Sequence, residues 1–112
     1  MVITVLDMTL PSGQEADTAR ALQGACDATR ACPGCVGGGV FRQVGRPAEI
    51  LYLEIWNEAD ALEAHIRSRD FDRLLAILET SPVPPSLTFR FVAETRGLAW
   101  VEELRLHSRE PA

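Results

Sequence analysis

His65 is the residue whose type and spacing are best suited to chemistry. It shares an apolar stripe with Leu62 and Ile66, at the spacing that places side chains on one face of a helix. An imidazole on such a face can move a proton near neutral pH, and a neighbouring carboxylate could tune it. A histidine at such a position can equally be a hydrogen-bonded core residue. Both interpretations stay open on the sequence alone.

Asp7 is the carboxylate we expect beside this histidine. It interrupts a strongly apolar segment between Leu6 and Met8, and a buried carboxylate there would need a partner or a raised pKa. If His65 is a catalytic base, Asp7 would orient it. The alternative is a residue at the solvated end of a strand.

Aromatic residues accompany this pair. Tyr52 and Trp56 should project to one side of a strand with Glu54 between them, as packing residues or as walls for a flat substrate. Phe71 continues the helical stripe of His65.

Two strand arginines, Arg42 and Arg90, could hold the oxygen of an acidic or phenolate substrate. They could equally pair with Glu54 or Glu94. Asn57 fits a helix cap better than a catalytic amide.

Cys32 and Cys35 form a Cys-x-x-Cys that allows a redox pair, half of a metal site or a turn. The pair follows a predicted helix, whose negative end should raise thiol pKa values, whereas redox pairs sit at helix starts. A zinc site would need more ligands than Cys26 and two distant histidines supply. A turn around Pro33-Gly34 is therefore favoured, and no metal site is expected.

Composition narrows the function classes. The 112 residues fit one domain, with 46% hydrophobic and 24% charged residues, and the net charge of −5 argues against a nucleic-acid binder. No apolar run is long enough to span a membrane, and no secretory signal is recognisable. Three cysteines are too few for a disulfide framework, so a cytoplasmic location is expected.

The elements that must position these residues follow the order β-α-β-β-α-β. They are predicted at 2–10, 14–31, 36–44, 49–56, 58–80 and 87–94. Ser12 and Glu15 have the spacing of a capping box, 68–70 should break the second helix, and Gly37-Gly38-Gly39 indicates a bulge or a close approach. Residues 96–106 favour a short helix, which together with the tail to 112 would extend the domain at 1–95.

This order predicts a ferredoxin-like α+β fold with a four-stranded antiparallel sheet and both helices on one face. Strand 49–56 is apolar on both sides, and so is strand 2–10. Because two helices cover only one face, the other face needs a cover that this chain lacks. We therefore expect a homodimer with two sheets packed face to face, and Trp100 as an anchor for the C-terminal segment.

The segments Pro33-Gly34-Cys35 and IWNEADALEAHIRSRDFDRLL (55–75), together with the fold order, resemble the antibiotic biosynthesis monooxygenase superfamily. The resemblance covers residues 2–94 and implies a dimeric α+β barrel. Its members include cofactor-free oxygenases of quinols and polyphenols, haem-degrading enzymes and isomerases. This chain has Asp7, His65 and Leu75 where the haem-degrading relatives carry other residues, which argues against haem breakdown.

The resemblance implies a cofactor-independent monooxygenase acting on a small aromatic substrate, with His65 as base and Asp7 orienting it. Arg42 or Arg90 would hold the substrate anion, and Trp56, Tyr52 and Phe71 would contact the ring. The alternatives are a non-catalytic dimeric module that binds a small ligand or a partner protein, and thiol chemistry at Cys32 and Cys35.

Overall fold

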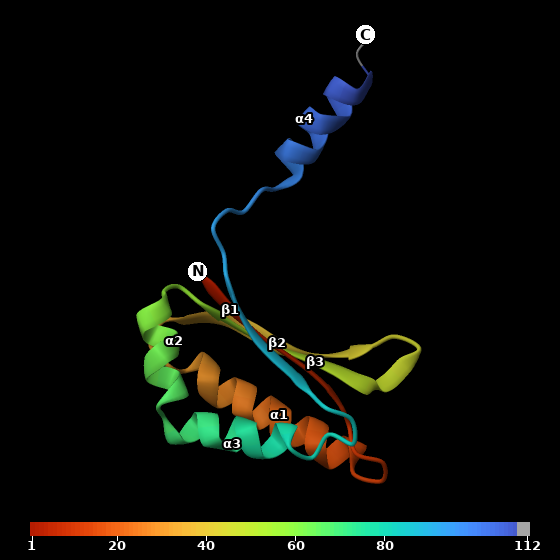
Figure 1. Cartoon of the computed structure of the whole chain (residues 1–112), viewed down its shortest axis with the longest axis vertical. Coiled ribbons are helices and arrows are strands. Elements are labelled where there is room, and N and C mark those ends of the chain that lie inside the picture. Colours follow the sequence, from red (N-terminus) through yellow and green to blue (C-terminus); the bar gives the residue numbers. More distant parts are fainter. Residues whose placement is uncertain (110–112) are drawn as a thin grey trace.

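The computed structural model describes residues 1–109, and the last part of the predicted tail, 110–112, lies outside the described residues. The chain runs β-α-β-β-α-α-β-α (Figure 1). The elements are β1 (Val2–Thr9), α1 (Glu15–Arg30), β2 (Cys35–Gln43), β3 (Arg46–Trp56), α2 (Ala59–Ile66), α3 (Arg69–Leu78), β4 (Ser86–Phe91) and α4 (Leu98–Arg109).

The four strands form one antiparallel sheet in the order β2-β3-β1-β4. The two apolar strands, β1 and β3, lie at its centre and pair from Val2 with Trp56 to Thr9 with Glu49. This is the ferredoxin-like arrangement that the sequence predicts, and the fold class is confirmed.

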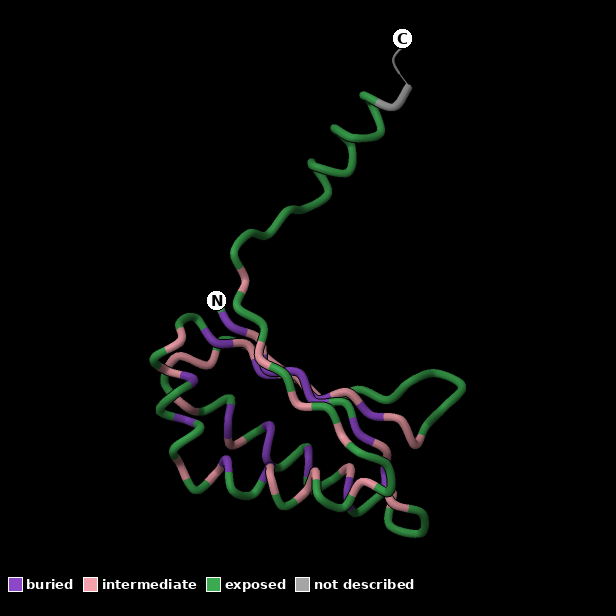
Figure 2. The backbone as a smooth tube through the Cα atoms, in the orientation of Figure 1, coloured by how far each residue is buried: buried purple, intermediate pink, exposed green. Residues whose placement is uncertain are grey.

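Helices α1, α2 and α3 cover one face of this sheet (Figure 1). The core lies between the two layers, where the buried residues of β1 and β3 face those of the helices (Figure 2). Even-numbered residues of β1 and β3, such as Leu6 and Tyr52, point into this core because strand side chains alternate between the two faces.

The second helix is broken where the sequence predicts it. Helix α2 ends at Ile66 and α3 begins at Arg69, with Ser68 between them in an extended conformation. The predicted caps are wrong: α1 follows Gln14 and α2 follows Glu58, and neither start has a side-chain capping bond. Asn57 instead donates its backbone N–H to the Gly34 carbonyl at 2.9 Å. This bond holds the start of α2 against the turn between α1 and β2.

The Cys-x-x-Cys segment is the turn between α1 and β2. Gly34 has a φ of +87°, and a Cβ there would meet the Ala61 side chain on α2. The predicted bulge is confirmed as a shift of register between Cys35 and Gly37, and Gly38 leaves room for the close Leu53 carbonyl of β3. Glycine is therefore required here for backbone conformation and close approach.

The second face of the sheet has no cover within residues 1–109 (Figure 1). Val5 and Leu53 pair at its centre, and Phe41 on β2 is 52% exposed. This open face carries the odd-numbered side chains of β1 and β3.

Helix α4 projects away from the body of the molecule (Figures 1 and 2). The predicted helix is confirmed, yet it leaves exposed the apolar side chains Leu98, Trp100, Val101, Leu104 and Leu106. The radius of gyration is 17.5 Å, against about 13 Å for a compact domain of about 100 residues. The extension of α4 accounts for this difference.

Among residues 1–109, no helix is both long enough and apolar enough to span a membrane.

Candidate functional site

The centre of the site is a buried carboxylate on β3. Tyr52, Glu54 and Trp56 alternate along the strand and all point toward the helices, as their spacing predicts. Glu54 is only 1% exposed. Burying an ionised carboxylate is costly unless hydrogen bonds or an opposite charge compensate.

Hydrogen bonds supply that compensation. The Tyr52 hydroxyl donates to Glu54 Oε2 at 2.6 Å, and Trp56 Nε1 donates to Oε1 at 3.2 Å. Burial by itself raises the pKa of Glu54, but the hydrogen bonds from His65 and Tyr52 outweigh it and hold the pKa below its ordinary value. Burial, together with the Glu54 charge, raises the pKa of Tyr52, so the phenol stays a donor. Glu54 is therefore an ionised acceptor.

His65 reaches this carboxylate from α2. Its Nε2 lies 3.5 Å from Glu54 Oε2 and 3.5 Å from the hydroxyl of Thr29, distances at the long limit of a hydrogen bond. Thr29 donates its own proton to the Ala25 carbonyl at 2.8 Å, so it can only accept from the histidine. With two acceptors facing it, Nε2 must carry the proton in the neutral ring.

The second ring nitrogen of His65 is therefore unprotonated. Nδ1 is buried and has no hydrogen-bond partner among the described residues. The side chains around it shield this lone pair, so a proton donor reaches Nδ1 only when they move aside, and the imidazolium that then forms would face ionised Glu54. The arrangement can support general-base chemistry.

Two aromatic rings fix the plane of the imidazole. The Trp56 ring lies tilted at a centroid distance of 5.0 Å, and the Phe71 ring approaches edge-on at 5.9 Å. The structure thus brings four of the predicted site residues together: His65, Trp56, Tyr52 and Phe71.

A pocket of about 510 Å³ opens over His65. It lies between the Cys32–Gly34 turn, α2 and the start of α3, and Asn57 and Ser68 contribute to its lining. Tyr52, Trp56 and Phe71 do not belong to the described lining, because they lie behind His65 in the core. A volume above about 300 Å³ suits a small organic ligand.

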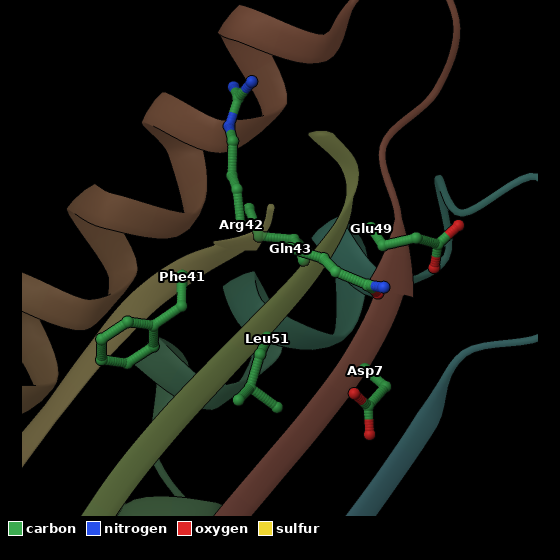
Figure 3. Close-up of a pocket in the computed structure, with 7 residues that line it drawn as sticks. Asp7, Phe41, Arg42, Gln43, Glu49 and Leu51 are labelled. Carbon is green, nitrogen blue, oxygen red and sulfur yellow. The ribbon is translucent and has the colours of Figure 1, made fainter. Parts of the chain in front are cut away.

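Asp7, by contrast, does not contact His65. It lies exposed on the open face and lines a second, smaller hollow of about 320 Å³ near the β2–β3 turn (Figure 3). Glu54 occupies the orienting position that the sequence analysis gave to Asp7. Strand alternation explains the difference, since Asp7 pairs with Leu51, which has the opposite orientation to Tyr52.

The two arginines predicted to hold a substrate anion also lie elsewhere. Arg42 belongs to the hollow on the open face, where it extends away from Asp7 (Figure 3). Arg90 is an exposed residue of β4 that pairs with Ile3 of β1. Neither arginine lines the pocket over His65.

Three polar core residues were missed as site members: Glu54, Thr29 and Thr4. Thr4 is fully buried, and its hydroxyl has no geometrically aligned partner within the described chain. Glu54 could have been found from its position between two inward-pointing aromatic residues. Thr29 sits three residues after the buried Cys26 on α1, which is also a recognisable helical spacing.

The cysteines are unpaired. Cys32 donates weakly to the Ala28 carbonyl and Cys35 to the Gly37 carbonyl. Burial raises the pKa of the Cys32 thiol, which lowers its nucleophilicity at neutral pH. Within residues 1–109 no group of three or more His, Cys, Asp or Glu side chains is arranged to bind a metal ion.

Comparison with known proteins gives one family match. The sequence profile of the antibiotic biosynthesis monooxygenase family matches residues 1–76, which include β1 to α2 and most of α3. No curated protein matches the chain.

Solved structures repeat the fold at low identity. A Deinococcus radiodurans protein named as an antibiotic biosynthesis monooxygenase superposes with a TM-score of 0.78 at 20% identity, over 88% of this chain and 98% of its own. A Mycobacterium tuberculosis protein superposes with a TM-score of 0.68 at 18% identity, over 87% of this chain and 100% of its own. A Bacteroides thetaiotaomicron protein of unknown function superposes with a TM-score of 0.67 at 15% identity, over 80% of this chain and 92% of its own.

Proposed function

The chain belongs to the antibiotic biosynthesis monooxygenase family, and from this membership and the Glu54–His65 contact we propose a monooxygenase that acts on a small aromatic substrate. The observation that carries the proposal is the bonding of His65. Glu54 and Thr29 both face Nε2, Nδ1 has no partner among the described residues, and the residue lines a pocket of about 510 Å³.

In the proposed mechanism, Nδ1 of His65 takes a proton from a phenol-activated carbon of the substrate. Glu54 stabilises the imidazolium that forms and keeps the ring in the required tautomer, as the carboxylate of a catalytic triad does. His65 is 4% exposed, so water competes little for this nitrogen.

The remaining steps use molecular oxygen as the oxidant. The substrate carbanion gives its electron pair to O₂, and the peroxide that forms takes back the proton from His65. Loss of the second C–H proton with cleavage of the O–O bond gives a carbonyl and water. In total, a CH₂ group and O₂ become C=O and H₂O.

Oxygen uptake with a quinol or anthrone-type substrate tests this function. His65→Ala should lower the rate by about 10²- to 10⁴-fold, the usual contribution of a general base. His107→Ala on exposed α4 is the matched control and should leave the rate unchanged. An uptake rate that is equal in both variants contradicts the proposal. Substrate binding without any turnover would favour the non-catalytic binding module.

We also propose that the chain forms a homodimer through the open face of its sheet. Leu53, Ile55 and Phe41 present apolar surface there, and an uncovered sheet face of this kind normally packs against a second layer. A second copy offers the same apolar surface, so two open faces can cover each other.

Residues 1–95 would form the catalytic domain, and α4 would be an extension that packs on the second copy through its exposed Trp100 and Leu104. The three unpaired thiols support a reducing cytoplasm as the location.

A further inference from the structure

The pocket over His65 carries an unusual charge for a site that must form a substrate anion. Three carboxylates belong to its lining, those of Glu58, Asp60 and Asp70. The lining contains no arginine or lysine in the described chain, although Arg67 and Arg69 flank Ser68 in sequence.

Asp60 and Asp70 lie in the first turns of α2 and α3, where they complement the helix dipoles, but the three carboxylates have no side-chain partner in the described chain. None of them forms an ion pair or a side-chain hydrogen bond among residues 1–109, and neither α2 nor α3 has a side-chain cap at its start. The helix N-termini beside them each supply about half a positive charge. Three carboxylates against two helix termini leave a net charge of roughly −2.

His65 supplies an independent indication that a ligand binds in this pocket. Its side chain is only 2% exposed, and it lines the same pocket with Nδ1 lacking a partner among the described residues. A buried polar nitrogen normally has a hydrogen-bond partner, and a molecule that enters the pocket and displaces the side chains now covering Nδ1 would provide one. Any proton that the ring gains is balanced by Glu54 and does not offset the three carboxylates.

We propose that this pocket selects a phenolic substrate that also carries a protonated amine, with the ammonium held among Glu58, Asp60 and Asp70 and the phenol ring directed to His65. The amine class follows from the charge of the pocket, and the phenolic part rests on the proposed function. The ammonium also offsets the carboxylate field that would otherwise oppose loss of a substrate proton at His65.

Three probes of nearly equal shape test this selection: tyramine, 4-ethylphenol and 3-(4-hydroxyphenyl)propionate. They share the phenol ring and a two-carbon chain and differ in net charge at pH 7, being cationic, neutral and anionic. Isothermal titration with the full chain at low salt should show tyramine binding about five- to tenfold more tightly than 4-ethylphenol, with the propionate weakest. Because Debye screening weakens charge contacts, 0.5 M salt should reduce the difference.

Two variants locate the effect. Asp70→Asn should remove most of the preference for tyramine and leave the affinity for 4-ethylphenol unchanged. Glu63→Gln removes the same charge from α2 at an exposed position outside the pocket lining, so it should keep the preference. Circular dichroism checks that both variants are folded.

Equal binding of the three probes to the wild-type chain, or no binding of any of them, would overturn the proposal. So would a tyramine preference that survives Asp70→Asn together with Asp60→Asn. These outcomes do not depend on oxygen chemistry. A tyramine preference without oxygen uptake would keep the amine site and reject the monooxygenase, whereas oxygen uptake without a preference would do the reverse.

Discussion

At the scale of single residues, the molecule is organised around one buried charge. Glu54 would be destabilising in the core without Tyr52, Trp56 and His65, which surround its two oxygens with donors. A buried, hydrogen-bonded carboxylate adds little net stability compared with apolar packing, so its benefit is better sought in orientation. Here it fixes which nitrogen of His65 is free.

Glu54→Gln tests the structural part of this description. The substitution keeps the size of the side chain but places an amide NH₂ where a carboxylate oxygen accepts from Trp56 or His65. We expect the free energy of unfolding at pH 7 to fall by about 2 kcal/mol, the usual cost of unmatched buried groups. Urea unfolding followed by far-UV circular dichroism measures it.

The stability cost of Glu54→Gln should depend on pH. The pKa of Glu54 is held below its ordinary value of 4.5 in the folded chain, so the ionised carboxylate stabilises the fold above that pH. This contribution is lost as the pH falls through the lowered folded-state pKa. The stability difference between wild type and Glu54→Gln should therefore shrink between pH 7 and pH 3. A constant difference over this range would contradict the assignment.

At the scale of elements, the Cys32–Gly34 turn positions the pocket. It ends α1, begins β2 and contacts the first turn of α2 through the backbone bond from Asn57 to Gly34. The left-handed Gly34 and its close approach to Ala61 set how near α2 lies to this turn. Gly34 and the backbone of this segment therefore position α2, and the thiols contribute little to that role.

Gly34→Ala should destabilise the chain more than a change at an equally left-handed glycine. Gly45 has a φ of +86° and nothing within 4 Å of an added Cβ, so Gly45→Ala should cost only about 1 kcal/mol for its conformation. Gly34→Ala has the same conformational cost and also overpacks against Ala61, for a total of about 2–4 kcal/mol. Thermal unfolding of both variants measures the difference. Equal costs would show that the contact with α2 relaxes freely.

Sequence reasoning predicted the elements better than the partners of their side chains. Alternation along β1 and β3, helical spacing in α1 and the breaks at Pro33-Gly34 and Ser68 are local signals, and each of them is confirmed. The partner of His65 depends on strand register and on which face each strand turns toward the helices. Asp7 was assigned to the wrong face for this reason, while Glu54 was two residues from each predicted aromatic wall.

At the scale of the whole molecule, the single chain leaves two apolar surfaces without cover in the described residues. One is the open face around Leu53, Ile55 and Phe41, and the other is the stripe on α4 that includes Trp100 and Leu104. Monomeric proteins rarely expose two such surfaces, because burying apolar area is favourable. Pairing of two chains through the open faces would also bring the Asp7 hollow into the interface.

Leu53→Glu tests this assembly. Leu53 pairs with Val5 on one side and Gly39 on the other, so it lies near the middle of the open face, and its side chain is outside the core under the helices. We expect light scattering after gel filtration to give twice the mass of one chain for the wild type and a single chain for the variant. Each chain would bury an unpaired carboxylate in the interface, at a cost of several kcal/mol that favours dissociation.

Ala21→Glu on the exposed side of α1 is the matched control and should remain dimeric. Leu53→Glu should change the free energy of unfolding of the single chain only slightly, because substitutions of partly exposed side chains outside the core usually have small effects on stability. If the variant unfolds, the assembly and the fold are coupled, and Thr88→Glu on the same face of β4 gives a second test at an exposed position. A wild-type chain that stays monomeric at millimolar concentration would contradict the dimer and leave α4 to pack on its own subunit.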